Sequence, residues 1–331
     1  MARRRKPRSR WKMVAGGIGA IALLLLAGPR ACVRTPDAAR IASMIPSSLD
    51  SLPAWLAARE AETGVTDTAM TKRVVFADGV VRTPYSVVYL HGFSASRQET
   101  APLSEAVARA LGANLFETRL HGHGLTGKAL GKASARDWLA DAIEAMEIGS
   151  RLGDSVIVIG TSTGGTLGAW LAANASQRRA MRALVLISPN FGPRDGNAAY
   201  LTWPWASVVL PLFMPDRQWS PRNDEQRLYW NVRYPIQALF PMQALVEHVR
   251  DRSLDGYAIP TLTFFNTDDQ VIDVARMFTW LDALDSASTA PVQRVQVLPT
   301  QGEDGHVLAG RIVAPSQTTS FRDRIVAFIR E

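Results

Sequence analysis

The sequence predicts an α/β protein built on a doubly wound, mostly parallel β-sheet. From about Arg73 onward, short apolar runs alternate with longer segments of helical spacing, which is typical of parallel strands joined by right-handed helical crossovers. One of these runs, residues 155–160 (SVIVIG), is apolar throughout, as expected for a strand in a sheet covered by helices on both faces. The chain has 331 residues, 47% of them hydrophobic and 20% charged, so it can bury such a sheet.

The individual strands and helices follow from local patterns. Residues 86–91 (SVVYLH) form an apolar run bounded by a proline and a glycine, which predicts a buried strand. Residues 134–152 carry apolar side chains on one helical face, and Ser134 with Asp137 resembles an N-terminal capping box. The other expected elements are helix 103–111, strand 114–120, helix 164–173, strand 183–188, strand 261–266, helix 271–284, strand 294–298 and a helix near 320–330.

Residues 192–255 interrupt this alternation with a segment rich in aromatic residues and helix breakers. The segment is either a lid over a pocket or an additional packing layer. A lid is favoured because ligands bind at the carboxyl ends of such strands, where the insertion leaves the sheet. Its apolar run 208–214 (VVLPLFM) is expected to form a wall of the pocket. The insertion contains four of the nine tryptophans, Trp203, Trp205, Trp219 and Trp230.

The charge distribution excludes one class of function. The formal net charge is +7, and residues 1–12 contain seven basic residues and no acidic one. The rest of the chain is therefore formally neutral, so the excess belongs to a tail and not to a nucleic-acid-binding face. The chain has one cysteine, Cys32, which excludes an intramolecular disulfide and cysteine-rich zinc sites.

Residues 13–28 (MVAGGIGAIALLLLAG) form an uncharged apolar segment after the basic tail. As a helix they would span about 24 Å, slightly less than a hydrocarbon core of about 30 Å. We expect an uncleaved transmembrane anchor, with the tail in the cytoplasm and the folded domain outside it, in the periplasm of a Gram-negative cell. Secretion after signal cleavage and lipidation at Cys32 are the alternatives. A stalk with a short helix near 50–62 is expected at 29–72, followed by the globular domain at 73–331.

Residues 160–164 (GTSTG) place Ser162 in a Gly-x-Ser-x-Gly motif between an apolar strand and a helix. A sharp turn here strains the serine backbone, and the flanking glycines remove side chains that would meet neighbouring backbone. The hydroxyl would then stand above the sheet, at the positive end of the following helix. Ser162 is therefore the candidate nucleophile.

With this motif, the sequence resembles the α/β-hydrolase superfamily, and in particular its lid-bearing serine esterases of the monoacylglycerol-lipase-like kind. The resemblance covers roughly residues 73–331. Residues 91–93 (HGF) match the turn after an early strand that donates an oxyanion-hole N–H in this family, and residues 122–124 match its Gly-His-Gly loop. The resemblance implies an α/β-hydrolase fold, with Phe93 and Thr163 as the two oxyanion-hole donors.

The resemblance also implies the chain order serine, acid, histidine. The acid should follow a late strand, where Asp268, Asp269 and Asp273 lie. The spacing best matches Asp269, with Asp268 as the alternative. The histidine should lie in a loop after the last strand, where His306 is the only histidine after position 248.

These residues predict a serine hydrolase that cleaves carboxylic esters, with apolar acyl or lipid-like substrates expected. His306 would accept the proton of Ser162 during attack on a carbonyl, and Asp269 would orient His306. No cofactor, metal ion or nucleic acid is indicated, and the oligomeric state is open. The alternatives are a peptidase or thioesterase on the same triad, or a non-catalytic hydrolase-like binding protein. A peptidase would need carboxylates in the lid to capture a substrate amine, and the candidates are Asp216, Asp224 and Glu225.

Two weaker patterns point elsewhere. Residues 122–129 (GHGLTGKA) resemble a phosphate-binding loop, but Ala129 stands where such a loop needs a hydroxyl for Mg²⁺, so nucleotide binding is disfavoured. His91, His121 and His123 have no carboxylate or cysteine at ligand spacing. Structural hydrogen bonding is therefore a better interpretation of these histidines than metal binding.

Overall fold

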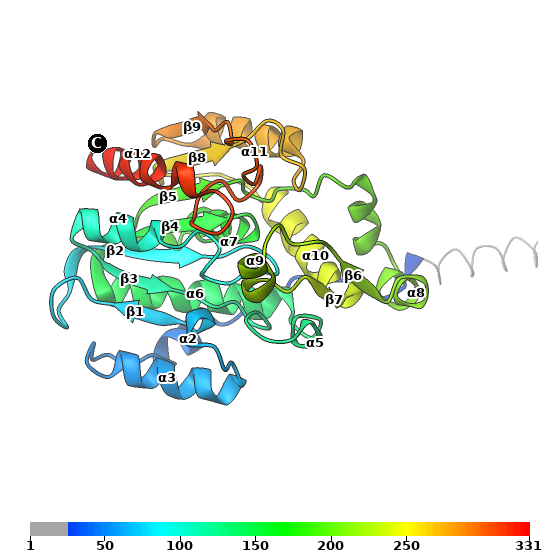
Figure 1. Ribbon diagram of the computed structural model, residues 1–331, viewed down its shortest axis with the longest axis horizontal. Helices are drawn as coiled ribbons and strands as arrows, with labels where there is room; N and C mark the ends of the chain where they lie inside the picture. Colours follow the sequence, from blue (N-terminus) through cyan, green and yellow to red (C-terminus); the bar gives the residue numbers. More distant parts are fainter. Residues whose placement is uncertain (1–25) are drawn as a thin grey trace, which may run out of the picture.

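A seven-stranded sheet forms the centre of the computed structural model, which describes residues 26–331 (Figure 1). The strand order is β1-β3-β2-β4-β5-β8-β9, and every neighbouring pair is parallel except β1 with β3. The predicted doubly wound, mostly parallel sheet is therefore confirmed. The strands are β1 (Arg73–Val75), β2 (Thr83–Leu90), β3 (Asn114–Glu117), β4 (Gly153–Thr161), β5 (Met181–Ile187), β8 (Thr261–Phe265) and β9 (Val292–Gln296).

Helices cover both faces of the sheet. Successive residues of a strand point to opposite sides, and the strands carry apolar side chains on both sides that the helices bury. The main helices are α4 (Leu103–Leu111), α6 (Ala135–Leu152), α7 (Thr163–Ala173), α11 (Val274–Ala287) and α12 (Thr318–Arg330). On one face, α4 and α12 lie side by side (Figure 1) and pack on Val87 and Tyr89. On the other face, α6, α7 and α11 share a core with Val88 and Leu90.

The helix ends follow their capping residues. The predicted capping box is present, since the Ser134 side chain accepts from the N–H of Asp137 and the Asp137 side chain accepts from the N–H of Ser134. Helix α11 begins three residues later than predicted because the Asp273 side chain caps it, accepting from the N–H groups of Ala275 and Arg276. Short elements complete the domain: η1 (Thr68–Met70), α5 (Gly127–Leu130), η2 (Arg178–Ala180) and η5 (Pro315–Gln317).

Two helices precede the sheet in the segment that was expected to be a stalk, α2 (Ala38–Met44) and α3 (Leu52–Thr63). The Arg119 guanidinium holds α3 to the sheet, donating to both carboxylate oxygens of Glu60 at 2.7 and 3.0 Å. Both side chains are buried, with 5% and 6% of their surface exposed. Because a buried charge is stable only when it is paired, this ion pair ties α3 to the globular domain.

The prediction of an N-terminal transmembrane segment, with membrane contact through residues 13–28, is wrong for the part of the chain that the structure describes. No helix within residues 26–331 has the length and apolar character needed to cross a bilayer, and residues 13–25 lie outside the described residues. The apolar run is short for a span, at about 24 Å against about 30 Å. Directly after the run, the Pro29 carbonyl accepts from the N–H of Trp205 in the insertion at 2.9 Å. The location of the domain outside the cytoplasm stays a prediction.

The insertion between β5 and β8 lies beyond the carboxyl ends of the strands (Figure 1). Its helix α8 carries most of the run 208–214, but Leu212 and Phe213 are 77% and 82% exposed. This run therefore faces solvent over much of its surface. The elements of the insertion are η3 (Gly196–Thr202), α8 (Ala206–Phe213), β6 (Asp216–Gln218), α9 (Asp224–Tyr229), β7 (Arg233–Pro235), η4 (Ile236–Ala238) and α10 (Leu239–Arg250).

Candidate active site

Ser162 occupies the sharp turn between β4 and α7. Its backbone angles, φ 51° and ψ −117°, lie in a region that strains every residue other than glycine. Backbone hydrogen bonds hold the turn: the N–H of Ser162 donates to the Ile187 carbonyl at 2.9 Å, and the Ser162 carbonyl accepts from Asn190 at 3.1 Å. Because Ser162 is the N-cap residue of α7, it lies at the positive end of that helix.

The two glycines of the motif let backbone segments approach around Ser162. A Cβ atom on Gly160 would lie 2.5 Å from the Gly164 carbonyl oxygen, and a Cβ atom on Gly164 would collide with the Leu90 carbonyl oxygen. No larger residue fits at either position without a shift of the backbone. The glycines are therefore required by the close packing of β2, β4 and α7.

Asp269 and His306 come together although they are far apart in the sequence. Oδ2 of Asp269 lies 2.7 Å from Nδ1 of His306, while Oδ1 accepts from the N–H groups of Val271 and Ile272 at 2.7 and 3.1 Å. Asp269 is only 1% exposed, whereas its alternative, Asp268, is exposed. The structure therefore brings Asp269, and not Asp268, to His306.

The surroundings of His306 favour its protonated form. Burial lowers the pKa of His306, but the negative charges of Asp269, Asp304 and Glu99 and the hydrogen bond to Asp269 outweigh burial, so the pKa is raised above its ordinary value. With Nδ1 bound to Asp269, Nε2 is the ring nitrogen left to act on a neighbouring hydroxyl. Ser162 and His306 are 7% and 8% exposed, so both lie in a nearly closed site.

The turn after β2 brings Phe93 next to the nucleophile. A Cβ atom on Gly92 would lie 3.2 Å from Cβ of Ser162, so this turn passes directly beside the serine. Among residues 26–331, no protein group accepts a hydrogen bond from the backbone N–H of Phe93 or of Thr163. Both N–H groups are free to donate to a ligand atom, as an oxyanion hole requires.

A buried carboxyl group that sequence reasoning missed, Glu99, supports the same turn. Its Oε2 accepts from the N–H of Gly92 at 2.7 Å and from the hydroxyl of Tyr89 at 3.0 Å. Burial raises the pKa of Glu99 to about 7, against the lowering effect of these hydrogen bonds and of His306. The only signal in the sequence is an acidic residue seven positions after Gly92, which has no recognisable spacing of its own.

The histidines His91 and His123 shape the backbone around this turn. His91 Nε2 accepts from the N–H of Leu120 at 3.0 Å, and His123 Nε2 accepts from the N–H of Ser94 at 3.0 Å. Burial lowers the pKa of His91 to about 4 and lowers that of His123 as well, so both rings are neutral acceptors at pH 7. The predicted hydrogen-bonding role is confirmed for these two rings, whereas His121 is exposed and only its backbone is bonded. Within residues 26–331, no group of three candidate ligands is placed to hold a metal.

The insertion contacts both loops of the site. The N–H of Asn231 donates to the Ser94 carbonyl at 2.7 Å, and the ring of Tyr234 meets that of Phe93 edge to face, with 5.3 Å between centroids. Trp230 packs in one cluster with Val307, the residue after the site histidine. The insertion therefore lies against both the turn that carries Phe93 and the loop that carries His306, where a lid would lie.

The carboxylates of the insertion are engaged by arginines. Oδ2 of Asp216 lies 2.7 Å from Nη2 of Arg233, and Glu225 is paired with Arg311. Asp224 is fully exposed and lies 4.0 Å from Arg227. A substrate amine would have to displace an arginine from Asp216 or Glu225, so neither is a ready amine site, whereas Asp224 is open to solvent.

Comparison with known sequences agrees with this geometry. The family described as serine aminopeptidase, S33 matches residues 83–293. The thermostable monoacylglycerol lipase of Bacillus sp. (strain H-257) is 34% identical over 191 residues, which are 57% of this chain and 72% of that protein. The family match runs from the start of β2 into the start of β9 and includes Phe93, Ser162, Thr163 and Asp269 but not His306.

Solved structures of lipolytic enzymes share the fold. A structure from work on the metagenome-derived lipolytic enzymes LipS and LipT aligns with a TM-score of 0.61 at 20% identity, over 80% of this chain and 98% of that one. The Paleococcus ferrophilus monoacylglycerol lipase aligns with a TM-score of 0.56 at 14% identity, over 78% and 97%. The sequence matches and the shared fold together show that this chain belongs to the serine aminopeptidase S33 family and is a serine hydrolase of the α/β-hydrolase superfamily.

Proposed function

We propose that this hydrolase cleaves carboxylic esters with apolar acyl groups through an acyl-enzyme at Ser162. The observation that carries this proposal is the buried Asp269–His306 pair, with 2.7 Å between oxygen and nitrogen, at the same end of the parallel sheet as Ser162 in its strained turn. A serine hydroxyl is a poor nucleophile at neutral pH unless a base removes its proton. His306, held by Asp269 in the tautomer that leaves Nε2 unprotonated, is suited to be that base.

The reaction would proceed in two acyl transfers. Ser162 Oγ forms a bond to the ester carbonyl carbon while Nε2 of His306 takes the hydroxyl proton, and the N–H groups of Phe93 and Thr163 stabilise the resulting oxyanion. Collapse breaks the ester C–O bond, and His306 returns the proton to the departing alcohol. Water then attacks the acyl-enzyme with His306 again as base, and the carboxylic acid and free Ser162 are released.

The substrate class rests on the insertion and on the relatives. Aromatic side chains of the insertion, Tyr234 and Trp230, pack on the two loops of the site, and each methylene buried against such a surface contributes about 0.8 kcal/mol. The Bacillus relative is a monoacylglycerol lipase, which supports an ester of an aliphatic acid. The family description includes aminopeptidases, but two of the three candidate amine partners in the lid, Asp216 and Glu225, are already paired with arginines.

A labelling and substrate experiment tests this proposal on the full chain. The wild-type protein should be labelled by a fluorophosphonate probe and should hydrolyse p-nitrophenyl esters, with kcat/KM rising from acetate to medium-chain acyl groups. Ser162→Ala should lose both labelling and turnover while keeping its circular dichroism spectrum. Turnover of aminoacyl amides without turnover of esters would make the protein a peptidase, and absence of labelling and turnover would make it a binding protein.

A further inference from the structure

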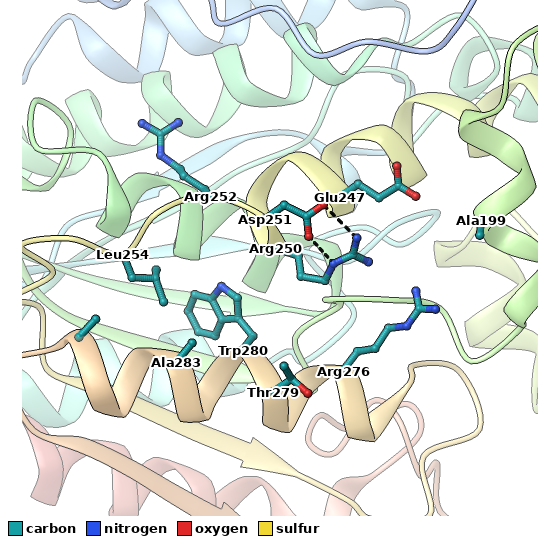
Figure 2. Close-up of a pocket in the computed structure, with 11 residues that line it drawn as sticks. Ala199, Glu247, Arg250, Asp251, Arg252, Leu254, Arg276, Thr279, Trp280 and Ala283 are labelled. Carbon is teal, nitrogen blue, oxygen red and sulfur yellow. Dashed lines mark hydrogen bonds and ion pairs between the residues drawn. The ribbon is translucent and has the colours of Figure 1, made fainter. Parts of the chain in front are cut away.

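A cavity lies between the insertion and helix α11, and no residue of the candidate active site lines it. Its volume is about 620 Å³, within the usual range of sites for small molecules. Figure 2 shows its two main walls, the C-terminal end of α10 with the following loop and one face of α11. The cavity is lined by Ala199, Glu247, Arg250, Asp251, Arg252, Leu254, Arg276, Thr279, Trp280, Ala283 and Ala287.

One wall presents a hydrogen-bond donor that has no partner. Trp280 is 3% exposed and stacks on Phe191, with 4.0 Å between ring centroids. Its indole Nε1 is buried and no group in residues 26–331 accepts a hydrogen bond from it. The nitrogen-bearing edge of the ring faces the cavity (Figure 2). A buried N–H without an acceptor is rare in folded proteins, so this donor indicates a ligand that brings an acceptor.

Arginines add positive charge with free donors to the same cavity. Arg250 uses Nε and Nη2 on Asp251, at 2.7 and 3.1 Å, and Arg276 uses Nε on Asp273, at 3.2 Å. The Nη1 group of Arg250 and both Nη groups of Arg276 are left without a carboxylate, and the two guanidinium groups lie on the same side of the cavity (Figure 2). Two guanidinium groups with unused N–H donors at one cavity can bind an anion by charge-assisted hydrogen bonds.

The carboxylates of the cavity do not fill that role. Glu247 accepts from the hydroxyl of Thr202 at 3.2 Å and from Nε2 of Gln243 at 2.8 Å, and Asp251 is held by Arg250. Arg252 has no carboxylate partner in the described part of the chain. The lining therefore holds three arginines against two carboxylates, Glu247 and Asp251, and this excess of positive charge favours an anionic ligand.

The remaining surface of the cavity is apolar and elongated. Trp280, Ala283 and Ala287 lie on one face of α11, three and four residues apart, with Leu254 on the opposite wall. From Arg276 to Ala287 the helix rises about 16 Å, at 1.5 Å per residue. An unbranched aliphatic chain could lie along this face while its charged end remains between the arginines.

We propose that this cavity binds a medium-chain carboxylate, with the carboxylate between Arg250 and Arg276 and the chain along Trp280, Ala283 and Ala287. Planar guanidinium groups bind carboxylates by paired hydrogen bonds, and the Trp280 N–H supplies a further donor. Such a carboxylate is the acid that ester cleavage would release, so its identity as a product rests on the proposed function. Its binding does not, because the cavity excludes Ser162 and His306.

Calorimetric titration of the full chain with decanoate tests the proposal, with decanol as the neutral ligand of matched length. Decanoate should bind and decanol should not at the same concentrations. Ala283→Trp fills the cavity from an exposed helical position and should abolish the decanoate signal, whereas Ala57→Trp, at an exposed position of α3, should leave it unchanged. Arg250→Gln should weaken binding about tenfold, as expected for one charge-assisted hydrogen bond.

Three outcomes would overturn the proposal: no heat from decanoate, equal binding of decanol, or unchanged decanoate binding in Ala283→Trp. Ester turnover is measured separately on the same proteins and should be equal in Ala283→Trp and Ala57→Trp. If the protein binds decanoate in this cavity but does not hydrolyse esters, the proposed function is refuted and the proposed carboxylate site still stands. A chain that hydrolyses esters without binding decanoate there would refute the site alone.

Discussion

The backbone N–H of Gly92 donates to Oε2 of the buried Glu99 at 2.7 Å, directly beside the turn that carries the Phe93 N–H. The Tyr89 hydroxyl, 3.0 Å from the same oxygen, fixes the carboxyl group from the adjacent strand. Because an oxyanion donor acts only when it points at the developing charge, Glu99 is a positioning residue for the proposed oxyanion hole. Its position near His306 gives it a second, electrostatic effect on the base.

Glu99→Ala should lower kcat for ester hydrolysis about tenfold or more with little change in KM. The variant removes the group that positions the Phe93 N–H, which acts on the transition state, and leaves the contacts with bound substrate unchanged. Glu99→Gln keeps an oxygen acceptor for Gly92 and should retain most of the turnover. Steady-state kinetics of both variants with one p-nitrophenyl ester measure the difference. Equal losses in the two variants would mean that charge, and not positioning, is what the site needs.

The acid limb of the pH–rate profile should move in Glu99→Gln. His306 must be neutral to accept the proton of Ser162, so activity falls as pH decreases through the raised pKa of His306. The charges of Asp269, Asp304 and Glu99 raise that pKa, and removing the Glu99 charge should therefore shift the acid limb of kcat/KM to lower pH. An unmoved limb would show that Glu99 is protonated over the working range.

Asp269→Asn should reduce kcat by about 10⁴-fold, since an amide stabilises neither the working tautomer nor the imidazolium of His306. Asp268→Asn is the matched control, and its kcat should stay close to wild type because Asp268 is exposed and makes no contact with His306. Single-turnover measurements on both variants separate chemistry from product release. A larger loss at Asp268 would contradict the geometry of the loop after β8.

Gly164→Ala should destabilise the fold by about 3 kcal/mol or more, because the new Cβ collides with the Leu90 carbonyl of the neighbouring strand. Gly196→Ala is the matched control: nothing lies within 4 Å of its Cβ position, so its effect should stay within about 1 kcal/mol. Urea unfolding followed by tryptophan fluorescence compares the two variants. Similar midpoints would show that the backbone can relax around the motif.

Glu60→Gln should cost about 3–5 kcal/mol of unfolding free energy, because it leaves the Arg119 charge buried without its partner. Asp154→Asn breaks an ion pair whose side chains are 71% and 48% exposed and should cost less than about 1 kcal/mol. Urea unfolding of the full chain measures both. A small effect at Glu60 would mean that α3 can detach from the sheet without loss of the domain.

The sequence by itself determined the features that arise from nearest neighbours along the chain. Alternation of apolar strands and helices predicted the sheet, and Ser134 with Asp137 predicted the start of α6, because caps and periodicity act over a few residues. The Gly-x-Ser-x-Gly motif predicted the position and strain of Ser162 for the same reason. The resemblance indicated His306 and Asp269 but left Asp268 open, since the two adjacent aspartates differ only in which way the loop turns them.

Only the tertiary structure decided the features that depend on residues distant in sequence. Asp269 reaches His306 because the N–H groups of Val271 and Ile272 turn its carboxylate inward. Glu99 acquires its role by burial under the oxyanion turn, and the cavity beside Trp280 exists only where α10 and α11 leave a space between them. The local pattern of apolar residues also predicted a membrane segment, and the described residues contain no helix able to span a membrane. Local patterns specify backbone conformation, whereas burial and contact depend on which surfaces meet when the chain folds.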